Sequence, residues 1–231
     1  NGRWDVGWRN WIVNNQINAR RFFGHLSFYR QTMKYITILL IVLLHLPTWG
    51  QQINSPYRKS QIEHCMKPIY SITAFYQIAD SLQMTIDELS DYPVISPIKK
   101  SGRISSGFGM REHPCYKRRS FHTGIDIPQP EGTPVYSTGN GIVVARGYDS
   151  GYGYFIEIQH ASGFRSFYAH LSWILVNVRD KVSITQQIAC VGSTGVATGS
   201  HLHYEVRKDK RYLNPIGWCY LLFKYLNDDF S

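Results

Sequence analysis

The 231-residue sequence has few cysteines, and none of them are paired at a metal-binding spacing. Its four cysteines are far apart and form no C-x-x-C pair: Cys65, Cys115, Cys190 and Cys219. These spacings argue against a cysteine-rich structural zinc site. An exported chain would permit one or two disulfides, whose pairing the sequence does not define. Cys190 lies in the apolar stretch "QIACVGS", where we expect a buried free thiol.

The sequence also lacks an apolar run of the about 20 residues that a transmembrane helix needs. A shorter run at residues 35–46 follows the basic Lys34 and precedes the helix-breaking Pro47. With the small-x-small triplet that ends at Gly50, this layout predicts a secretory signal peptide at residues 33–50. An uncleaved membrane anchor is the alternative. The protein is therefore expected to be exported, to the periplasm or the cell surface.

Residues 1–32 precede that segment and carry Trp and Arg without a sustained period or a cap signal. If translation begins at Met33, they are an upstream extension of doubtful status, and we assign them no function.

Motifs for nucleic-acid binding are missing as well, since no helix-turn-helix, zinc finger or stacking platform occurs. The formal net charge is +9, and residues 1–50 hold six Lys and Arg against one acidic residue. The remaining surplus is mild and suits a solvated surface near an anionic polymer or membrane. We therefore expect no nucleic-acid partner.

Residues 51–93 are predicted to form a helical pre-segment or linker. Apolar residues from Ile69 to Ala79 recur at helical spacing. Thr85 followed by Glu88 fits a capping box at the start of one more short helix. The segment could pack on the main domain, serve as a spacer, or lie across an active site and inhibit it.

Residues 94–216 differ in composition, with short β-branched and aromatic runs between glycine-rich turns. Runs such as "GIVVARGY", "YFIEIQH" and "HLHYEV" are typical of an antiparallel, mainly β domain. "YFIEIQH" alternates as a half-buried strand should. Residues 217–231 form a C-terminal tail, in which we expect a closing helix that buries Leu221, Leu222 and Tyr225.

Two groups of chemistry-bearing residues lie in this β region. In "HTGIDI", His122 and Asp126 are four apart, so one extended strand would project both from the same face, with Gly124 leaving room for a metal. In "HLHYEV", His201 and His203 share a face in the same way.

Two histidines and one aspartate suit Zn²⁺ and leave a fourth tetrahedral position for water, as catalytic zinc requires. The spacing does not say whether both His201 and His203 bind the metal, whether one is a catalyst, or whether they form only a polar strand face. His170, in "FYAHLS", is a further histidine near a strand end.

The blocks "SSGFGMREHP…FHTGIDIP", "YAHLS" and "VGSTGVATGSHLHYEV" resemble the signature blocks of lysostaphin/LytM-type zinc metallopeptidases. The resemblance extends from about Pro97 to Pro215. It implies an antiparallel β-sheet domain of the duplicated hybrid motif type. It also implies a zinc endopeptidase that cleaves peptide cross-links of bacterial cell-wall peptidoglycan through a metal-activated water.

Carried over by position, the resemblance implies His122, Asp126 and His203 as the Zn²⁺ ligands. It implies His170 and His201 as the catalytic pair, without saying which of them is the base. His113, in "REHP", is expected in the second shell or at the edge of the cleft.

The partners that the resemblance implies are peptidoglycan stem peptides or cross-bridges, bound by a monomer. Membrane contact is expected only through an uncleaved signal segment. The alternative function is a non-catalytic wall-binding or hydrolase-activating module on the same fold. The complete set of five residues, four histidines and one aspartate, favours the enzyme.

Overall fold

The computed structural model describes residues 55–99, 103–112 and 118–228. The expected signal peptide, the upstream extension, His113 and Cys115 lie outside the described residues. The chain divides into two units, Asn1–Lys59 and Ser60–Ser231, and the second contains the sheet and the histidines of interest. Within the described part of the chain, no helix is long and apolar enough to cross a membrane.

Three helices precede the strands: α3 (Pro56–Met66), α4 (Ile72–Ser81) and α5 (Ile86–Leu89). The expected capping box is present at the start of α5. The Thr85 amide donates to a Glu88 carboxylate oxygen at 2.9 Å, and the Glu88 amide donates to the Thr85 hydroxyl at 3.3 Å. Reciprocal bonds of this kind satisfy two amides that a helix start leaves unpaired.

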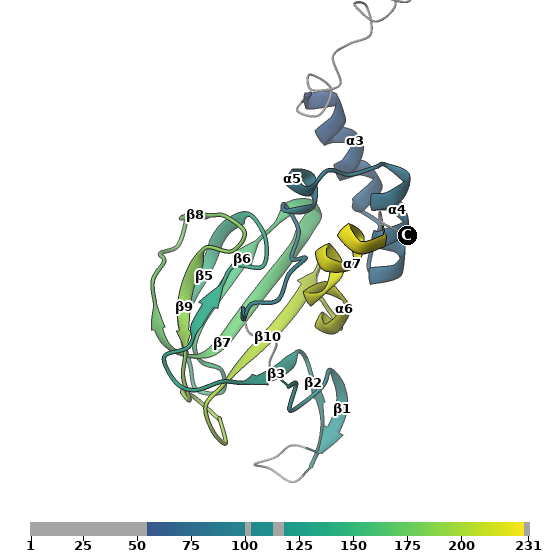
Figure 1. Ribbon diagram of the computed structural model, residues 1–231. Helices are drawn as coiled ribbons and strands as arrows, with labels where there is room; N and C mark the ends of the chain where they lie inside the picture. The colour runs from purple at the N-terminus through teal and green to yellow at the C-terminus, as the bar shows by residue number, and fades with distance from the viewer. Residues whose placement is uncertain (1–54, 100–102, 113–117, 229–231) are drawn as a thin grey trace, which may run out of the picture. The chain divides into compact units, whose positions relative to one another are not determined.

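The strands form a small sheet and a large one (Figure 1). The small sheet pairs β1 (Gly109–Glu112) with β2 (Arg119–His122). The large sheet contains β3 (Ile125–Pro128), β4 (Pro134–Tyr136), β5 (Gly141–Asp149), β6 (Gly153–Gln159), β7 (Phe164–Ile174), β8 (Lys181–Val182), β9 (Gln187–Val191), β10 (His201–Lys208) and β11 (Arg211–Leu213).

The main path across the large sheet runs β11-β10-β7-β6-β5-β8, with β3 also paired to β10, and β9 to both β4 and β7. The strand pairs are antiparallel throughout. The structure therefore confirms the predicted antiparallel, mainly β fold.

The core lies on one face of the large sheet. Leu202, Tyr204 and Val206 of β10 are completely buried, and α6 (Pro215–Cys219) packs against the same strand. An aromatic cluster links the helices to the sheet through edge-to-face and tilted ring contacts; its members are Phe75, Tyr92, Phe164 and Trp218. Such contacts add to the free energy gained by burying the rings.

Lys208, at the end of β10, is buried on this core face. Its ammonium donates to the carbonyls of Met66 and Ile69 at 2.7 and 2.8 Å. It also lies 4.3 Å from the centre of the Phe164 ring. A buried cation needs such partners, and here they tie the end of α3 to the sheet.

The C-terminal tail forms the expected helix, α7 (Leu221–Asp228). Leu221 and Tyr225 are buried as predicted, whereas Leu222 is half-buried. The described cysteines, Cys65, Cys190 and Cys219, are all free thiols. Cys190 is half-buried, so the prediction of a buried thiol at this position was wrong.

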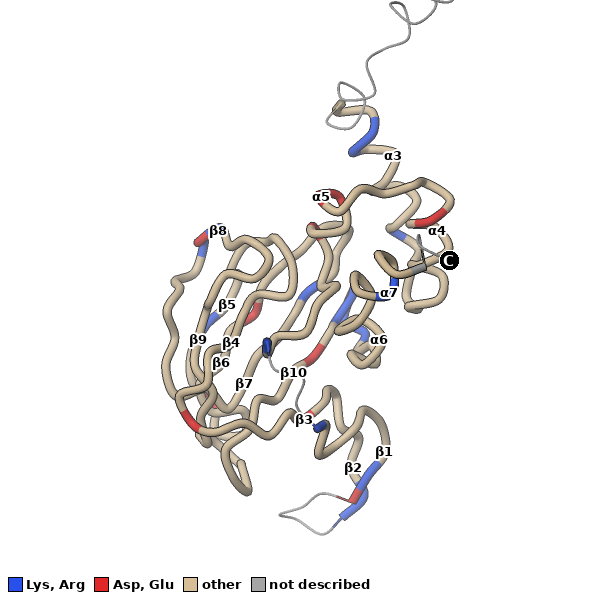
Figure 2. Tube along the Cα trace, in the orientation of Figure 1, with Lys and Arg blue, Asp and Glu red and all other residues tan. Residues whose placement is uncertain are grey.

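Lys and Arg residues are spread along helices and strands in the described part of the chain (Figure 2). Several are engaged in specific contacts, such as Arg207, which stacks on the Phe167 ring at 4.1 Å. This distribution agrees with a mild, dispersed basic surplus.

Candidate active site

Strand pairing brings two of the predicted site residues together. β3 and β10 are antiparallel neighbours, and His203 is the direct partner of Asp126. Their side chains meet on the face of β10 opposite the core, with His203 Nδ1 2.9 Å from Asp126 Oδ1. On the other side of β3, the Asp126 amide and carbonyl bond to Ser106 and Ser105 of the "SSGFG" block at 3.0 Å. The aspartate is therefore held by backbone on both sides.

His122 also lies beside Asp126, but not through the single extended strand that their spacing predicts. Residues 122–126 do not form one strand, because β2 ends at His122 and β3 begins at Ile125. Gly124 lies in the connection, pressed against β10. A Cβ there would lie 2.4 Å from the Tyr204 carbonyl oxygen. The glycine thus makes room for a neighbouring strand, and the prediction that one extended strand carries His122 and Asp126 was wrong.

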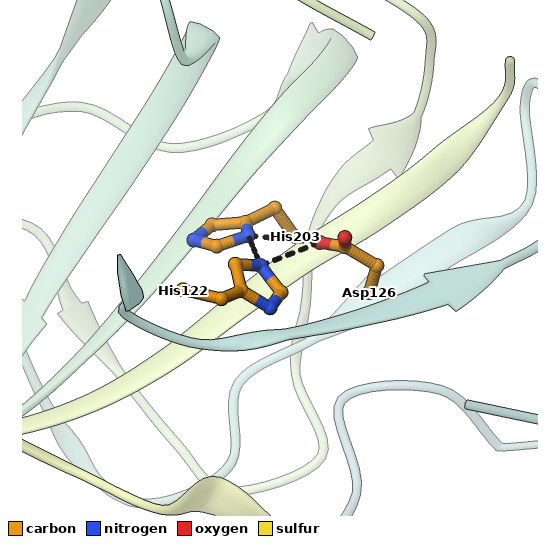
Figure 3. A group of neighbouring side chains, drawn as sticks. All are labelled: His122, Asp126 and His203. Atoms are coloured by element: carbon orange, nitrogen blue, oxygen red, sulfur yellow. Dashed lines mark hydrogen bonds and ion pairs between the residues drawn. The ribbon is translucent and has the colours of Figure 1, made fainter. Parts of the chain in front are cut away.

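The three side chains converge on one point (Figure 3). His122 Nε2 lies 3.1 Å from both Asp126 Oδ1 and His203 Nδ1. One ligand atom from each residue lies within 4.8 Å of the others, and all three residues are buried. Two imidazole nitrogens and one carboxylate oxygen form a donor set of the kind that Zn²⁺ takes in catalytic sites. The residues present therefore fit a zinc ion.

Neighbouring acceptors set the orientation of both imidazoles. His122 Nδ1–H donates to the Gly107 carbonyl at 2.7 Å, which leaves Nε2 toward the shared point. His203 uses the opposite nitrogens, because its Nε2–H donates to Glu205 at 3.0 Å and Nδ1 faces Asp126. Hydrogen bonds to the outer nitrogen fix the tautomer and raise the basicity of a ligating histidine.

Glu205 is completely buried and saturated with donors. Besides His203, it accepts hydrogen bonds from the Thr123 hydroxyl, the Tyr152 hydroxyl at 3.2 Å, and the Arg207 guanidinium. Burial by itself would raise the pKa of Glu205, but His203 and Arg207 outweigh it and hold that pKa below its usual range. The residue is an anion that orients His203. Its place on the strand face that carries the histidines follows from the alternation of side chains along β10.

The two candidate ligands on the paired strands, Asp126 and His203, have opposite pKa shifts. Burial would raise the pKa of Asp126, but hydrogen bonds from His122 and His203 lower it far below its ordinary value. Burial would lower the pKa of His203, but Asp126 and Glu205, one on each ring nitrogen, raise it. The two carboxylates on either side of His203 therefore stabilise the protonated form of its imidazole.

His170 and His201 lie beside this group, with ring centres 4.6 Å apart. Their Nδ1–H groups donate to the carbonyls of Thr194 and Gly199, both at 2.8 Å. This leaves Nε2 as the free nitrogen of each ring. His201 Nε2 lies 3.7 Å from Asp126 Oδ1. The structure thus places both histidines next to the candidate metal point with the same tautomer.

The backbone at His170 is unusual. Its φ is +58°, in the left-handed region that favours glycine, and the neighbouring pairing of β7 is interrupted by register shifts. A residue held in this way costs of order 1–3 kcal/mol and tends to occur at functional sites. Burial lowers the pKa of His170 to about 4, assisted by the nearby His201 and His203. Its imidazole is therefore neutral at neutral pH.

A cleft of about 250 Å³ opens over the histidines. Its other lining residues include Arg111, Phe121, Asp149, Tyr152, Val196 and Thr198. Val196 and Thr198 belong to the third of the signature blocks, "VGSTGVATGSHLHYEV". Sequence analysis missed Arg111, which lies within the first signature block, and Tyr152, which lies two residues before "YFIEIQH". His113 lies outside the described residues, so its expected place at the cleft edge stays a prediction.

Comparisons with known proteins agree with this arrangement. Residues 120–215 match the family model described as peptidase family M23. The DD-carboxypeptidase/endopeptidase Mpg of Neisseria meningitidis serogroup B is 44% identical over 114 residues, which cover 49% of this chain and 26% of that protein. The peptidoglycan DD-endopeptidase ShyA of Vibrio cholerae is 45% identical over 121 residues, 52% of this chain and 28% of that protein.

A solved structure of the catalytic domain of lysostaphin, an antimicrobial peptidase from Staphylococcus simulans, is also similar. It is 29% identical, and the match covers 51% of this chain and 92% of that domain with a TM-score of 0.48. The chain spans about a quarter of the length of the curated relatives named above.

Proposed function

We propose, from the match of residues 120–215 to the model of peptidase family M23, that the chain is a zinc-dependent endopeptidase. Its proposed substrates are peptide cross-links of bacterial peptidoglycan. The observation that carries the proposal is the buried convergence of His122, Asp126 and His203 beside two further histidines with free Nε2 atoms. A purely structural zinc site would not need that second pair.

In this proposal His122, Asp126 and His203 hold Zn²⁺. The ion supplies Lewis acidity toward the scissile carbonyl and lowers the pKa of water. Glu205 and the Gly107 carbonyl keep the two ligating imidazoles in the required tautomers.

The chain's own proton chemistry comes from His170 and His201. The neutral imidazole of one acts as the general base and accepts the proton that the attacking water loses. The other, when protonated, donates a hydrogen bond to the oxyanion that develops on the substrate carbonyl. Their Nδ1 bonds to backbone carbonyls hold both Nε2 atoms ready for these tasks.

The site of action follows from the substrate. A hydrolase of cross-linked peptidoglycan works in the periplasm or at the cell surface, which agrees with the signal peptide expected at residues 33–50. We propose that the protein acts there as a monomer.

One experiment tests the proposal. The purified chain is assayed for zinc content, and its action on isolated peptidoglycan is followed by mass spectrometry of the released peptides. We expect about one zinc per chain and new peptide termini at cross-links. Full zinc occupancy with unchanged peptidoglycan would overturn the enzyme in favour of a non-catalytic wall-binding module.

A further inference from the structure

The cleft contains one arginine that the proposed reaction does not use. Arg111 belongs to β1, where it pairs with Ser120 of β2. Two positions along the same pair of strands, Gly109 is the partner of His122. Because side chains alternate along a strand, Arg111, Ser120 and His122 share one face, and all three line the cleft.

Arg111 contacts the candidate metal site but uses few of its hydrogen-bond donors there. One terminal nitrogen donates to Asp126 Oδ2 at 3.3 Å, while Oδ1 of the same carboxylate faces the histidines. The Arg111 Nε–H is buried and has no partner among the described residues. A guanidinium has five N–H donors, so most of the Arg111 donors have no partner among the described residues and can bind another group.

The charge of the cleft also indicates that Arg111 is available to bind a ligand. Arg111 is the one Lys or Arg among the described residues that line it. Asp149, from the end of β5, is already engaged by the amides of Gly151 and Tyr152 at 2.8 and 3.0 Å. The side chain of Arg111 is 26% exposed, so an entering ligand can reach it.

We propose that Arg111 is a specificity-determining residue that binds a carboxylate of the peptide substrate. The planar fork of a guanidinium matches a carboxylate through two parallel, charge-assisted hydrogen bonds. Because Arg111 also touches Asp126, a carboxylate held there lies close to the reacting peptide bond. The inference rests on the proposed function and adds a substrate class, peptides with a free carboxylate near the scissile bond.

Two sources in a stem peptide offer that chemistry: the free C-terminus, and the side-chain carboxyl of a diamino acid. Three synthetic cross-linked stem-peptide dimers separate them, one with both carboxyls free, one with the C-terminus as an amide, and one with the side-chain carboxyl as an amide. The wild-type chain, Arg111→Ala, Arg111→Lys and the control Arg119→Ala are assayed on each. Arg119 is exposed on β2 and does not line the cleft.

We expect wild type to lose about 10- to 100-fold in kcat/KM on one of the two amides, mainly through KM, the range for a hydrogen-bonded charge pair. Arg111→Ala should show the same loss on the free acid and no further loss on that amide. Arg111→Lys should recover part of the activity, because it keeps the charge without the fork. Arg119→Ala should match wild type.

Zinc affinity, measured by chelator competition, separates this role from a merely structural one. If Arg111→Ala lowers activity equally on all three peptides and weakens zinc binding, Arg111 acts through Asp126 and the proposal is wrong. Equal cleavage of the acid and both amides by wild type would also overturn it. A wild-type chain that binds zinc and cleaves neither the peptides nor peptidoglycan would instead overturn the proposed function itself.

Discussion

The two faces of β10 (His201–Lys208) have different roles, and each face carries four of its eight residues. One face presents His201, His203, Glu205 and Arg207 to the cleft and its supporting hydrogen bonds. The other buries Leu202, Tyr204, Val206 and Lys208 against the helices and the aromatic core. Alternation along a strand makes this separation possible.

The difference between the two faces shows which partners a charged group needs on each. On the cleft face, each charged group has a charged or hydrogen-bonded neighbour, and the chain of contacts extends from His203 through Glu205 and Arg207 to Glu157. On the core face, the single cation, Lys208, bonds only to backbone carbonyls among the described residues. Changes on the first face should therefore alter chemistry, and changes on the second should alter stability.

The largest effect is expected from His203→Ala. It removes a ligand from a three-ligand set and leaves Asp126 and Glu205 without their shared partner. We expect loss of bound zinc, measured by atomic absorption, and activity equal to that of a zinc-stripped wild-type sample. A variant that retains a full equivalent of zinc would refute the assignment of His203.

His201→Ala should separate catalysis from metal binding on the same face. The imidazole is not a proposed ligand, so zinc content should stay at the wild-type level. Loss of a general acid or base should lower kcat by about 100- to 10,000-fold. Release of zinc by this variant would show that the labour within the H-x-H pair is divided the other way.

Glu205→Gln should weaken zinc binding without removing a ligand. It replaces the anion that holds His203 Nε2 with a neutral group, and changes of this kind typically cost about 10- to 100-fold in metal affinity. Chelator competition measures the effect. Glu157→Gln is the matched control, because Glu157 contacts Arg207 and Arg165 but not His203. Equal affinities for the two variants would contradict the orienting role.

Lys208→Met tests the core face. It leaves the Met66 and Ile69 carbonyls without their donor, so the free energy of unfolding should fall by about 1–3 kcal/mol. Chemical denaturation measures this, with the exposed Lys181→Met as control. Zinc affinity should not change. A fall in zinc affinity larger than the loss of stability would mean that the two faces are coupled.

Zinc binding should also weaken on acidification. The pKa of His203 is raised in the metal-free protein, so its proton competes with the metal below that pKa. Affinity should then fall by about tenfold for each pH unit, the effect of one competing proton. Titration calorimetry in buffers of different ionisation enthalpy would count the protons released. A pH-independent affinity between pH 5 and 7 would contradict this expectation.

Local patterns in the sequence predicted the features that depend on neighbours along the chain. Strand alternation placed His201 and His203 on one face, and a two-residue signal located the capping box at Thr85 and Glu88. Each of these depends on backbone geometry within a few residues. Short motifs therefore supplied the histidine and aspartate candidates, and the family resemblance divided them into ligands and a catalytic pair.

Features that depend on pairing between distant strands were not predicted in the same way. The meeting of Asp126 with His203 comes from the β3–β10 pair, and the place of Gly124 is set by the Tyr204 carbonyl across from it. The positive φ of His170 arises where β7 changes its partners. Periodicity contains no information about which strands become neighbours, so these contacts needed the structure.

The direct pairing of Asp126 with His203 gives the metal a part in folding. A slip of β10 by one residue against β3 would set Leu202 or Tyr204 opposite Asp126 and turn both imidazoles toward the core face. Such a misfolded chain has no three-ligand set, so metal binds only the correctly aligned one and stabilises it by mass action. Zinc uptake would then favour the correct alignment of these two strands while the protein folds.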